Sequence, residues 1–348
     1  MSSPPTPGRA SRLPARLAGR RASQRGQGRP RVVALGDLVL DVVTRAQAPL
    51  AHASDTPGTI RFRQGGSAAN TARWVARLGG RATFIGAVGR DAWGRRLVAS
   101  LRGAGVTVHG PRVAAPSARI VVVIGPDGER SFVTERAAAD LLAPALINPA
   151  WLRGCAVLHL PAYSLLAEPL EQAARRAAEL ARAAGAALSV DLASRQPLLD
   201  AGPGVAWDRI EALSPDVLFA NAAEAAALAG VMRTGVAGTS VAARDLARLL
   251  GLAPLVVIKE GAAGCRVMAR PRDAAPGSPP LELVLAARPL HSSDTTGAGD
   301  AFDAGFLLAW AATPPAARLG AAALRRAALA GNRAAARLLG EPRPELVV

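Results

Sequence analysis

Short apolar runs alternate with longer amphipathic stretches along most of the chain. The runs occupy residues 32–35, 157–160, 187–190, 217–219 and 255–258. Between them lie stretches with apolar residues at helical spacing, such as residues 166–184. Buried strands that alternate with helices are typical of a parallel sheet covered on both faces. The sequence therefore predicts an α/β fold, a three-layer αβα sandwich with a mainly parallel central sheet.

Two segments break this alternation and predict a separate small sheet. Residues 42–64 and 113–136 contain alternating or β-branched stretches, and the second carries a Gly- and Pro-containing turn at residues 125–128. Such a turn between two β-rich runs predicts a hairpin. Because these strands are inserted between the first α/β units, we expect a small β lid built from about residues 42–64 and 113–136.

The first 29 residues form an Arg-rich segment with seven arginines and no acidic residue. They lack a periodic apolar pattern, which predicts a disordered tail ahead of one folded domain over residues 30–348. The tail supplies a large part of the formal net charge of +16, and the chain has a single lysine, Lys259. Because no aromatic platform or groove-reading helix accompanies this charge, we expect no nucleic-acid partner.

Neither a membrane span nor a metal-binding cysteine pattern is evident in the sequence. No apolar run reaches the length that crosses a bilayer, so we expect no membrane partner. Cys155 and Cys265 lie far apart in apolar surroundings, without metal-ligand spacing. Buried thiols of this kind are typical of a reducing compartment, which predicts a cytoplasmic protein.

The sharpest chemical motif is a glycine-rich turn, residues 294–300, which runs into an apolar helix over residues 302–310. Gly297 and Gly299 leave backbone N–H groups free at a helix N-terminus, where the helix dipole favours an anion. Asp300 lies at the start of this helix, where a carboxylate can accept a proton from a hydroxyl that attacks a bound phosphoryl group. The alternative is structural: a turn followed by an acid that caps the helix.

A second glycine-rich motif covers residues 65–72 and is followed by another amphipathic helix. Paired glycines at Gly65 and Gly66 let the backbone approach a ligand closely. Asn70 offers both a donor and an acceptor to a hydroxylated substrate. A loop that leads into an Asn-capped helix explains the same residues without any ligand.

Together, and in this order, the two motifs resemble the N- and C-terminal signatures of the ribokinase-like (PfkB) carbohydrate and nucleoside kinase family. The resemblance covers nearly everything from residue 31 onward. Four further segments are similar to family motifs: residues 36–41, 86–94, 221–224 and 259–264. The family resemblance implies ATP-dependent phosphorylation of a hydroxyl on a small sugar or nucleoside, with Mg²⁺ as cofactor.

The resemblance also implies a role for each matching position. Asp300 would be the catalytic base, with an anion hole at Gly297, Ala298 and Gly299. The acceptor would contact Asp41, Gly65, Gly66 and Asn70. The nucleotide side would include Asn221, Glu224, Lys259, Gly261, Gly264 and Asn332. Glu224 would act on Mg²⁺ through water, and Asp294 resembles a monovalent-cation ligand, for which K⁺ is the candidate. Lids of this family often pair between subunits, which makes a homodimer through the lid an expectation.

One position departs from part of the family. Some members have a lysine after the paired glycines and accept ribose or phosphorylated sugars, whereas this chain has Ser67. Ser67 thus weakens the case for a phosphosugar acceptor and leaves neutral sugars or nucleosides. Val39 stands where a ribokinase has a polar substrate contact, which counts against ribose itself. A non-catalytic sugar- or nucleotide-sensing protein of the same fold is the alternative function. A Walker phosphate loop is excluded, because Glu260 follows the only lysine.

Overall fold

The computed structural model describes residues 28–193, 202–230, 247–271, 273–275, 278–288, 290, 294–342 and 345–346. The predicted disorder of the Arg-rich tail therefore falls almost entirely outside the described residues.

The main body is built on a nine-stranded sheet with the strand order β15-β14-β13-β12-β11-β10-β1-β4-β6. Neighbouring strands from β6 to β13 pair in parallel, whereas β14 and β15 add an antiparallel edge. These strands span Arg31–Leu35 (β1), Arg81–Ile85 (β4), Thr107–His109 (β6), Val157–Pro161 (β10), Ala187–Asp191 (β11), Val217–Asn221 (β12), Leu255–Lys259 (β13), Cys265–Ala269 (β14) and Leu281–Leu285 (β15).

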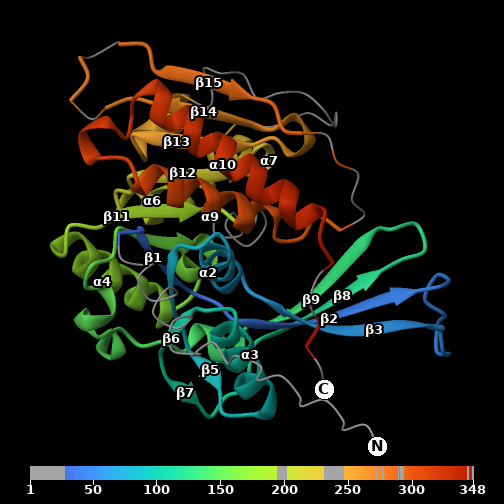
Figure 1. The fold of residues 1–348 in the computed structure, drawn as a ribbon. Helices are drawn as coiled ribbons and strands as arrows, with labels where there is room; N and C mark the ends of the chain where they lie inside the picture. Colours follow the sequence, from blue (N-terminus) through green and yellow to red (C-terminus); the bar gives the residue numbers. More distant parts are fainter. Residues whose placement is uncertain are drawn as a thin grey trace, which may run out of the picture.

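Helices cover both faces of this sheet, as predicted (Figure 1). One face carries α4 (Leu170–Ala183), α6 (Pro203–Glu211) and α7 (Ala222–Leu228). The other carries α2 (Ser67–Arg77), α3 (Ala92–Gly103), α9 (Ala298–Ala311) and α10 (Ala321–Leu339).

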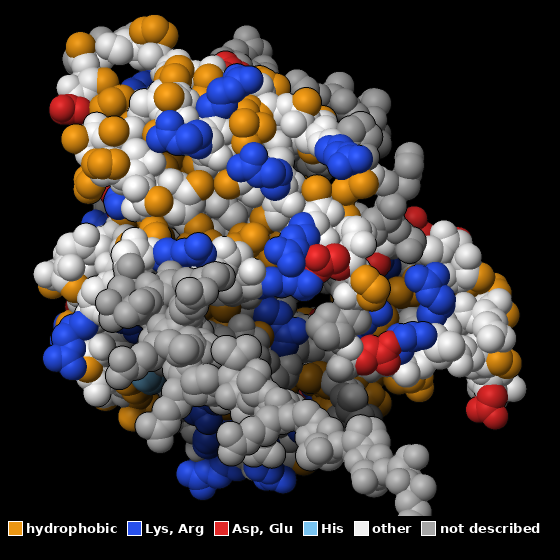
Figure 2. Space-filling model, in the orientation of Figure 1, with side chains coloured by type: hydrophobic (Ala, Val, Ile, Leu, Met, Phe, Trp, Pro, Cys, Tyr) orange, Lys and Arg blue, Asp and Glu red, His pale blue; other side chains and the backbone are white. Residues whose placement is uncertain are grey.

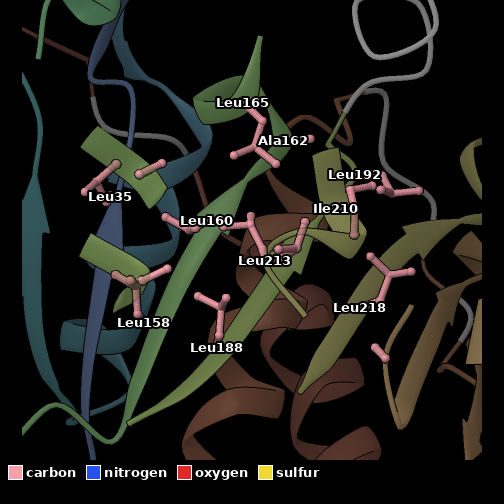
Figure 3. Close-up of a cluster of buried hydrophobic side chains, with 14 of the residues drawn as sticks. Leu35, Leu158, Leu160, Ala162, Leu165, Leu188, Leu192, Ile210, Leu213 and Leu218 are labelled. Atoms are coloured by element: carbon pink, nitrogen blue, oxygen red, sulfur yellow. The ribbon is translucent and has the colours of Figure 1, made fainter. Parts of the chain in front are cut away.

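Side chains along the central strands alternate between the two faces of the sheet, which divides the core into two layers. In β10, Leu158 and Leu160 point toward the α4 face, as does Leu188 of β11 (Figure 3). Val157 of β10 lies in the opposite layer, with Phe219 of β12. Successive side chains of a strand point to opposite faces, so a strand buried on both sides is apolar throughout. That continuous apolarity is the reason the five runs could be identified as buried parallel strands.

A second, four-stranded sheet with the order β3-β2-β8-β9 projects from the body (Figure 1). Its strands are β2 (Val39–Ala46), β3 (Gly58–Gly65), β8 (Arg119–Ile124) and β9 (Arg130–Glu135). The hairpin turn between β8 and β9 is closed by the Gly128 N–H, which donates to the Gly125 carbonyl over 3.0 Å. The sheet begins at Val39, three residues before the expected segment, because β2 pairs with β3 along its whole length.

Several elements were not predicted from the sequence. These are the antiparallel edge of β14 and β15, the strands β4 and β6, and a short two-stranded sheet of β5 (Val88–Gly89) and β7 (Arg112–Val113). Cys155 and Cys265 are both buried and free, in agreement with the sequence. Among the described residues, no helix is long and apolar enough to span a membrane.

Candidate active site

Two helix N-termini meet at the carboxyl ends of the central strands. Helix α2 begins at Ser67, directly after Gly66, and α9 begins at Ala298, directly after Gly297. Asp37, which follows β1, accepts a hydrogen bond from the Ala68 N–H over 3.2 Å and so holds the start of α2 against the sheet. The two glycine-rich motifs, more than 200 residues apart in sequence, therefore lie on opposite sides of one site.

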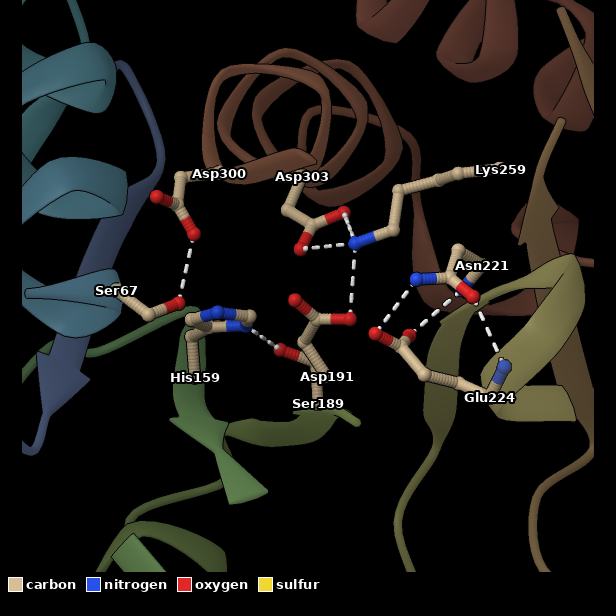
Figure 4. Close-up of polar contacts among 9 residues, drawn as sticks. All are labelled: Ser67, His159, Ser189, Asp191, Asn221, Glu224, Lys259, Asp300 and Asp303. Atoms are coloured by element: carbon tan, nitrogen blue, oxygen red, sulfur yellow. Dashed lines mark hydrogen bonds and ion pairs between the residues drawn. The ribbon is translucent and has the colours of Figure 1, made fainter. Parts of the chain in front are cut away.

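Asp300, in the first turn of α9, faces the start of α2, and two side chains of α2 contact its carboxylate. Ser67 Oγ donates to Asp300 Oδ1 over 2.6 Å, and Asn70 Nδ2 donates to Asp300 Oδ2 over 2.9 Å (Figure 4). Burial disfavours the charged carboxylate and raises the pKa of Asp300 to about 6, although the Ser67 and Asn70 hydrogen bonds act in the opposite direction. A carboxylate with such a pKa is ionised at neutral pH and is a better proton acceptor than an exposed aspartate.

The N-terminus of α9 has the features of an anion site. Gly297 adopts a left-handed conformation with φ of 74°, and no side chain caps the helix. The N–H groups of the first helical turn lack partners within a helix, so an uncapped N-terminus can offer them to an anion. The Ala298 N–H already donates to the Thr295 carbonyl over 3.1 Å. Gly297, Ala298 and Gly299 thus form the start of α9, directly before Asp300.

Beneath this turn lies a buried charged cluster that the sequence did not predict. Lys259 Nζ donates to Asp191 Oδ1 over 2.8 Å and pairs with Asp303 Oδ2 at 3.2 Å (Figure 4). Burial opposes the ammonium charge, but the two carboxylates outweigh it and raise the pKa of Lys259. A Cβ added to Gly299 would lie 3.2 Å from Lys259 Nζ, so the ammonium sits directly behind the anion site.

The sequence contained a weak signal for these two carboxylates. Asp191 directly follows a predicted buried strand. Asp303 follows Asp300 by three residues, which places Asp300 and Asp303 on one side of the helix. Without knowledge of which strands are neighbours, neither residue could be connected with Lys259.

Asn221 and Glu224 form a capping box at the start of α7. Asn221 Oδ1 accepts from the Glu224 N–H over 2.9 Å, and Glu224 Oε2 accepts from the Asn221 N–H over 2.7 Å. Glu224 is only 5% exposed, and burial together with the negative charge of Asp191 raises its pKa to about 7. Within the described residues, no cluster of three or more His, Cys, Asp or Glu side chains could hold a metal ion unaided.

Beside Asp300 lies a small pocket of about 80 Å³, lined mainly by polar side chains. Its lining includes Asp41, Arg63, Gln64, Asn70 and Gly297. The amide nitrogen and oxygen of Gln64 are both buried without a protein partner. Buried amides are normally hydrogen-bonded, so a ligand or water is expected to complete the partners of Gln64. Gln64 was not predicted from the sequence, because nothing in a β-strand pattern marks a side chain that lacks a partner.

The paired glycines bring the pocket wall close to Asp41. A Cβ on Gly65 would lie 2.2 Å from Asp41 Oδ1, and one on Gly66 would lie 2.4 Å from the Asp37 carbonyl oxygen. Gly66 also has a positive φ of 96°, which disfavours any residue with a side chain. Both glycines therefore serve the packing of the loop against the strand that carries Asp41.

Asp294 joins the loop before α9 to the four-stranded sheet. Arg63 Nη1 of β3 donates to Asp294 Oδ2 over 3.0 Å, and Arg130 Nη2 of β9 lies 3.6 Å from Asp294 Oδ1. In this structure the carboxylate that resembles a monovalent-cation ligand thus faces two guanidinium groups.

The remaining nucleotide-side candidates lie apart from Asp300, around the turn between β13 and β14. Gly264 has a φ of 103°, and a Cβ there would lie 2.0 Å from the Leu285 carbonyl oxygen. Gly261, with a φ of 61°, has open space around it. Asn332 of α10 donates to the carbonyl oxygens of Leu285 and Ala286 over 3.4 and 3.3 Å. These contacts connect the turn, the β15 end and α10, and none of them reaches the carboxylate cluster.

Comparison with known proteins agrees with this architecture. The model of the pfkB family of carbohydrate kinases matches residues 29–343. Fructokinase-1 of Oryza sativa subsp. japonica is 35% identical over 279 residues, which cover 78% of this chain and 80% of the relative.

Solved structures extend the comparison. Adenosine kinase from Sinorhizobium meliloti is 26% identical with a TM-score of 0.74, over 91% of this chain and 96% of that one. Fructokinase with bound ATP from Xylella fastidiosa is 25% identical with a TM-score of 0.68, over 87% and 91% of the two chains. The chain belongs to the pfkB family of carbohydrate kinases and is a phosphotransferase with an alcohol group as acceptor.

Proposed function

We propose that the protein transfers the γ-phosphoryl group of ATP to a hydroxyl of a small neutral sugar, with Asp300 as general base and residues 297–299 as anion hole. The observation that carries this proposal is the position of Asp300. Its carboxylate lies at the start of α9, between the uncapped helix N-terminus and a polar pocket. One carboxylate is thereby within reach of both an acceptor hydroxyl and the phosphoryl group that the hydroxyl attacks.

The proposed reaction follows from this arrangement. Asp300 accepts the proton of the acceptor hydroxyl while the hydroxyl oxygen forms a bond to the γ-phosphorus. The bond from that phosphorus to the oxygen of the leaving ADP breaks. The N–H groups of the α9 turn and the Lys259 ammonium behind Gly299 stabilise the negative charge on the phosphoryl group during transfer. Ser67 and Asn70 orient the carboxylate for the transfer.

Mg²⁺ would be held mainly by phosphate oxygens and water, with Glu224 contributing through a water molecule. Mg²⁺ in phosphotransferases commonly keeps several waters and uses one or two carboxylates. The donor set here fits that description, because Glu224 is a buried carboxyl group whose pKa of about 7 reflects burial and the negative charge of Asp191. Bound Mg²⁺ would neutralise charge on the phosphates. Nucleotide binding stays a prediction for Asn221, Lys259, Gly261, Gly264 and Asn332. Binding of K⁺ at Asp294 also stays a prediction.

A sugar is favoured as acceptor by the polar character of the pocket. Asp41 and Asn70 can bond hydroxyl groups, and the unpartnered amide of Gln64 offers one more donor and acceptor. Fructose is the first candidate, because the 35% identical relative from Oryza sativa is a fructokinase. A nucleoside is the second candidate, because the similar structure from Sinorhizobium meliloti is an adenosine kinase.

The test is ATP consumption by the purified protein against a panel of neutral sugars, sugar phosphates and nucleosides, with Asp300→Asn as control. We expect turnover with at least one neutral sugar and loss of that turnover in the variant. The sensing alternative predicts acceptor binding without ATP consumption in either protein. Acceptor-independent ATP hydrolysis that persists in Asp300→Asn would also contradict the proposal.

Gln64→Leu tests the acceptor side separately. Leucine keeps most of the volume but removes both amide partners, so an acceptor hydroxyl would lose its hydrogen bonds. One hydrogen bond is worth about 0.5–1.5 kcal/mol, and we expect the acceptor KM to rise about tenfold with an unchanged KM for ATP. Equal changes in both KM values would place Gln64 outside the acceptor site.

The four-stranded sheet is proposed to act as a lid and as a dimer surface. Strand register places Asp41, Arg63 and Phe132 on the inner face of the sheet, where Arg63 contacts Asp294, and Ile60 and Val133 on the outer face. Gln64, at the body end of β3, has the register of the outer face and lines the pocket from the end of the strand. Ile60 and Val133 are 65% and 68% exposed, which is unusual for large apolar side chains on one surface. A second copy of the chain would cover them, while the inner face would exclude water from the phosphoryl transfer. Analytical ultracentrifugation of Ile60→Lys against the unaltered protein tests the dimer.

A further inference from the structure

A second cavity, of about 410 Å³, lies on the helical face that carries α9 and α10. It is formed where the end of α2, the second half of α9 and the middle of α10 come together. Leu308 on its wall follows Asp300 by eight residues in the same helix, which is about 12 Å along the axis. The cavity is therefore separate from the pocket beside Asp300, and none of the roles assigned above uses it.

Small side chains explain why this space is open. The facing positions on α9 and α10 are Ala309, Ala312, Ala330 and Ala334. Around them the helices already touch, since a Cβ on Gly305 would lie 2.6 Å from the Ala330 carbonyl oxygen. The backbones thus approach closely on one side, and the short side chains leave an apolar hollow beside that contact. Its volume lies in the range of small-molecule sites, which is about 300–1,000 Å³.

The hollow is bordered by positive charge. Arg29, Arg333 and Arg337 line it, and no acidic side chain is among its lining residues in the described part of the chain. Arg29 donates to the Gly79 carbonyl over 2.8 Å and Arg337 to Glu341 over 2.8 Å, which fixes two of the three side chains. Arg333 is exposed and belongs to α10, a helix with four arginines and no acidic residue. Figure 2 shows Lys and Arg side chains gathered over α10, with few Asp and Glu side chains among them.

We propose that this cavity is a binding site for a small amphipathic anion, an organic carboxylate with an apolar body the size of a medium-chain acyl group. The alanine and leucine walls would take the apolar body, because burial of apolar surface is favourable and non-directional. The guanidinium groups would take the carboxylate, since their fork of donors matches its two oxygens. A bound ligand would touch both α2 and α9, the helices whose opposite ends carry Ser67, Asn70 and Asp300.

Binding of decanoate to the full-length protein, measured by isothermal titration calorimetry below its micelle concentration, tests the site. Decylammonium serves as the charge control, because it has the same apolar body and the opposite head group. We expect decanoate to bind and decylammonium to bind at least tenfold more weakly. Equal binding of the two, or no binding of decanoate, would overturn the proposal.

Variants locate the binding. Arg333→Glu should weaken decanoate binding about tenfold or more, as expected for the loss of a hydrogen bond between charged groups. Arg325→Glu makes the same charge change on the same helix away from the cavity and should leave the affinity within about twofold. Equal losses in both variants would mean that only the net charge of α10 matters and would overturn the site.

A cavity-filling variant separates a site from a surface effect. Ala309→Leu adds apolar volume inside the hollow and should abolish decanoate binding. Circular dichroism and the melting temperature check that the variant is folded. Ala322→Leu makes the same substitution at an exposed position of α10 outside the hollow, so it is the matched control and should keep the affinity. Decanoate binding retained by a folded Ala309→Leu protein would overturn the proposal.

Discussion

The two glycine-rich loops have similar compositions but opposite surroundings. In the first loop, the space that a side chain would occupy is filled: atoms of Asp41 and Asp37 come within 2.4 Å of a Cβ on Gly65 or Gly66. In the second loop, the nearest atom to a Cβ on Gly297 is 3.6 Å away, and the nearest atom to a Cβ on Gly299 is Lys259 Nζ at 3.2 Å. Glycine in the first loop permits close packing, whereas glycine in the second leaves backbone N–H groups open.

This difference separates two tasks within one site. The first loop fixes the wall of the proposed acceptor pocket and places Ser67 and Asn70 against Asp300. The second loop is free to receive an anion at an uncapped helix N-terminus. We therefore expect substitutions in the second loop to affect the chemical step, and substitutions in the first loop to affect acceptor binding and folding stability.

The largest effect is expected for Asp300→Asn. The amide keeps the shape of the side chain but cannot accept the proton of the acceptor, and general base catalysis is worth about 10²–10⁴-fold. The turnover number should fall at least by the lower figure, while the KM for ATP changes little. Steady-state kinetics with the best acceptor measure both values. Near-normal turnover of Asp300→Asn would favour the view of Asp300 as a helix cap.

The next effect is expected for Gly299→Val in the open loop. The added side chain would press on Lys259 and block the N–H groups that face the transferring phosphoryl group. Loss of one such donor in other enzymes costs about 10²–10³-fold, so kcat/KM for ATP should fall by a similar factor. Gly103→Val, at a helical glycine with nothing within 4 Å of its Cβ position, is the control and should retain activity.

A smaller and different effect is expected for Gly65→Ala in the packed loop. A Cβ there would lie 2.2 Å from Asp41 Oδ1 and would displace that carboxylate. Overpacking costs about 1–3 kcal/mol, so the melting temperature should fall and the acceptor KM should rise about tenfold. The KM for ATP should stay constant. A loss of turnover without a change in acceptor KM would contradict the proposal that the first loop serves acceptor binding and the second loop serves the chemical step.

Much of the fold was predictable because it follows from one-dimensional patterns. Each of the five apolar runs is a strand buried on both faces, and most of the four-stranded sheet was predicted from alternation and a turn. Strands β14 and β15 were missed because they add an antiparallel hairpin at the edge of the sheet, and in β15 the exposed Glu282 interrupts the apolar run. The position of Asp300 in the first turn of α9 was predicted correctly, although the apolar pattern alone marked only residues 302–310.

The site was predictable only where a local motif carries it. Gly297, Gly299 and Asp300 are consecutive or nearly so, and their chemistry can be read from a short segment. The Lys259 cluster depends on β11, β13 and α9 being neighbours in space, which no local pattern records. The buried amide of Gln64 is likewise defined by a missing partner, and a missing partner is a property of packing.

The acid limb of the pH profile, which is the fall in turnover at low pH, is expected to report the protonation of Asp300. Burial raises the pKa of Asp300 to about 6, and only the deprotonated carboxylate can act as a base. Turnover should therefore fall as the pH drops below about 6 and level off above it. Glu224, with a pKa of about 7, and Asp303, whose pKa burial also raises, are two other buried carboxyl groups that could cause such a limb. Glu224→Gln and Asp303→Asn distinguish them, because a limb caused by Asp300 persists in both variants.

The smallest effect is expected for Ser67→Ala, which removes one hydrogen bond from the base. The Ser67 hydroxyl donates to Asp300 Oδ1 over 2.6 Å and stabilises the charged form, so it lowers the pKa that burial raises. Without it, the pKa of Asp300 rises further and the acid limb moves to higher pH. Well above the limb, turnover should be nearly unchanged, since Asn70 still holds the other carboxylate oxygen. Ser131→Ala on the exposed surface of β9 is the control and should leave the profile in place. A limb that stays fixed in Ser67→Ala, or moves to lower pH, would show that the first loop does not tune the base.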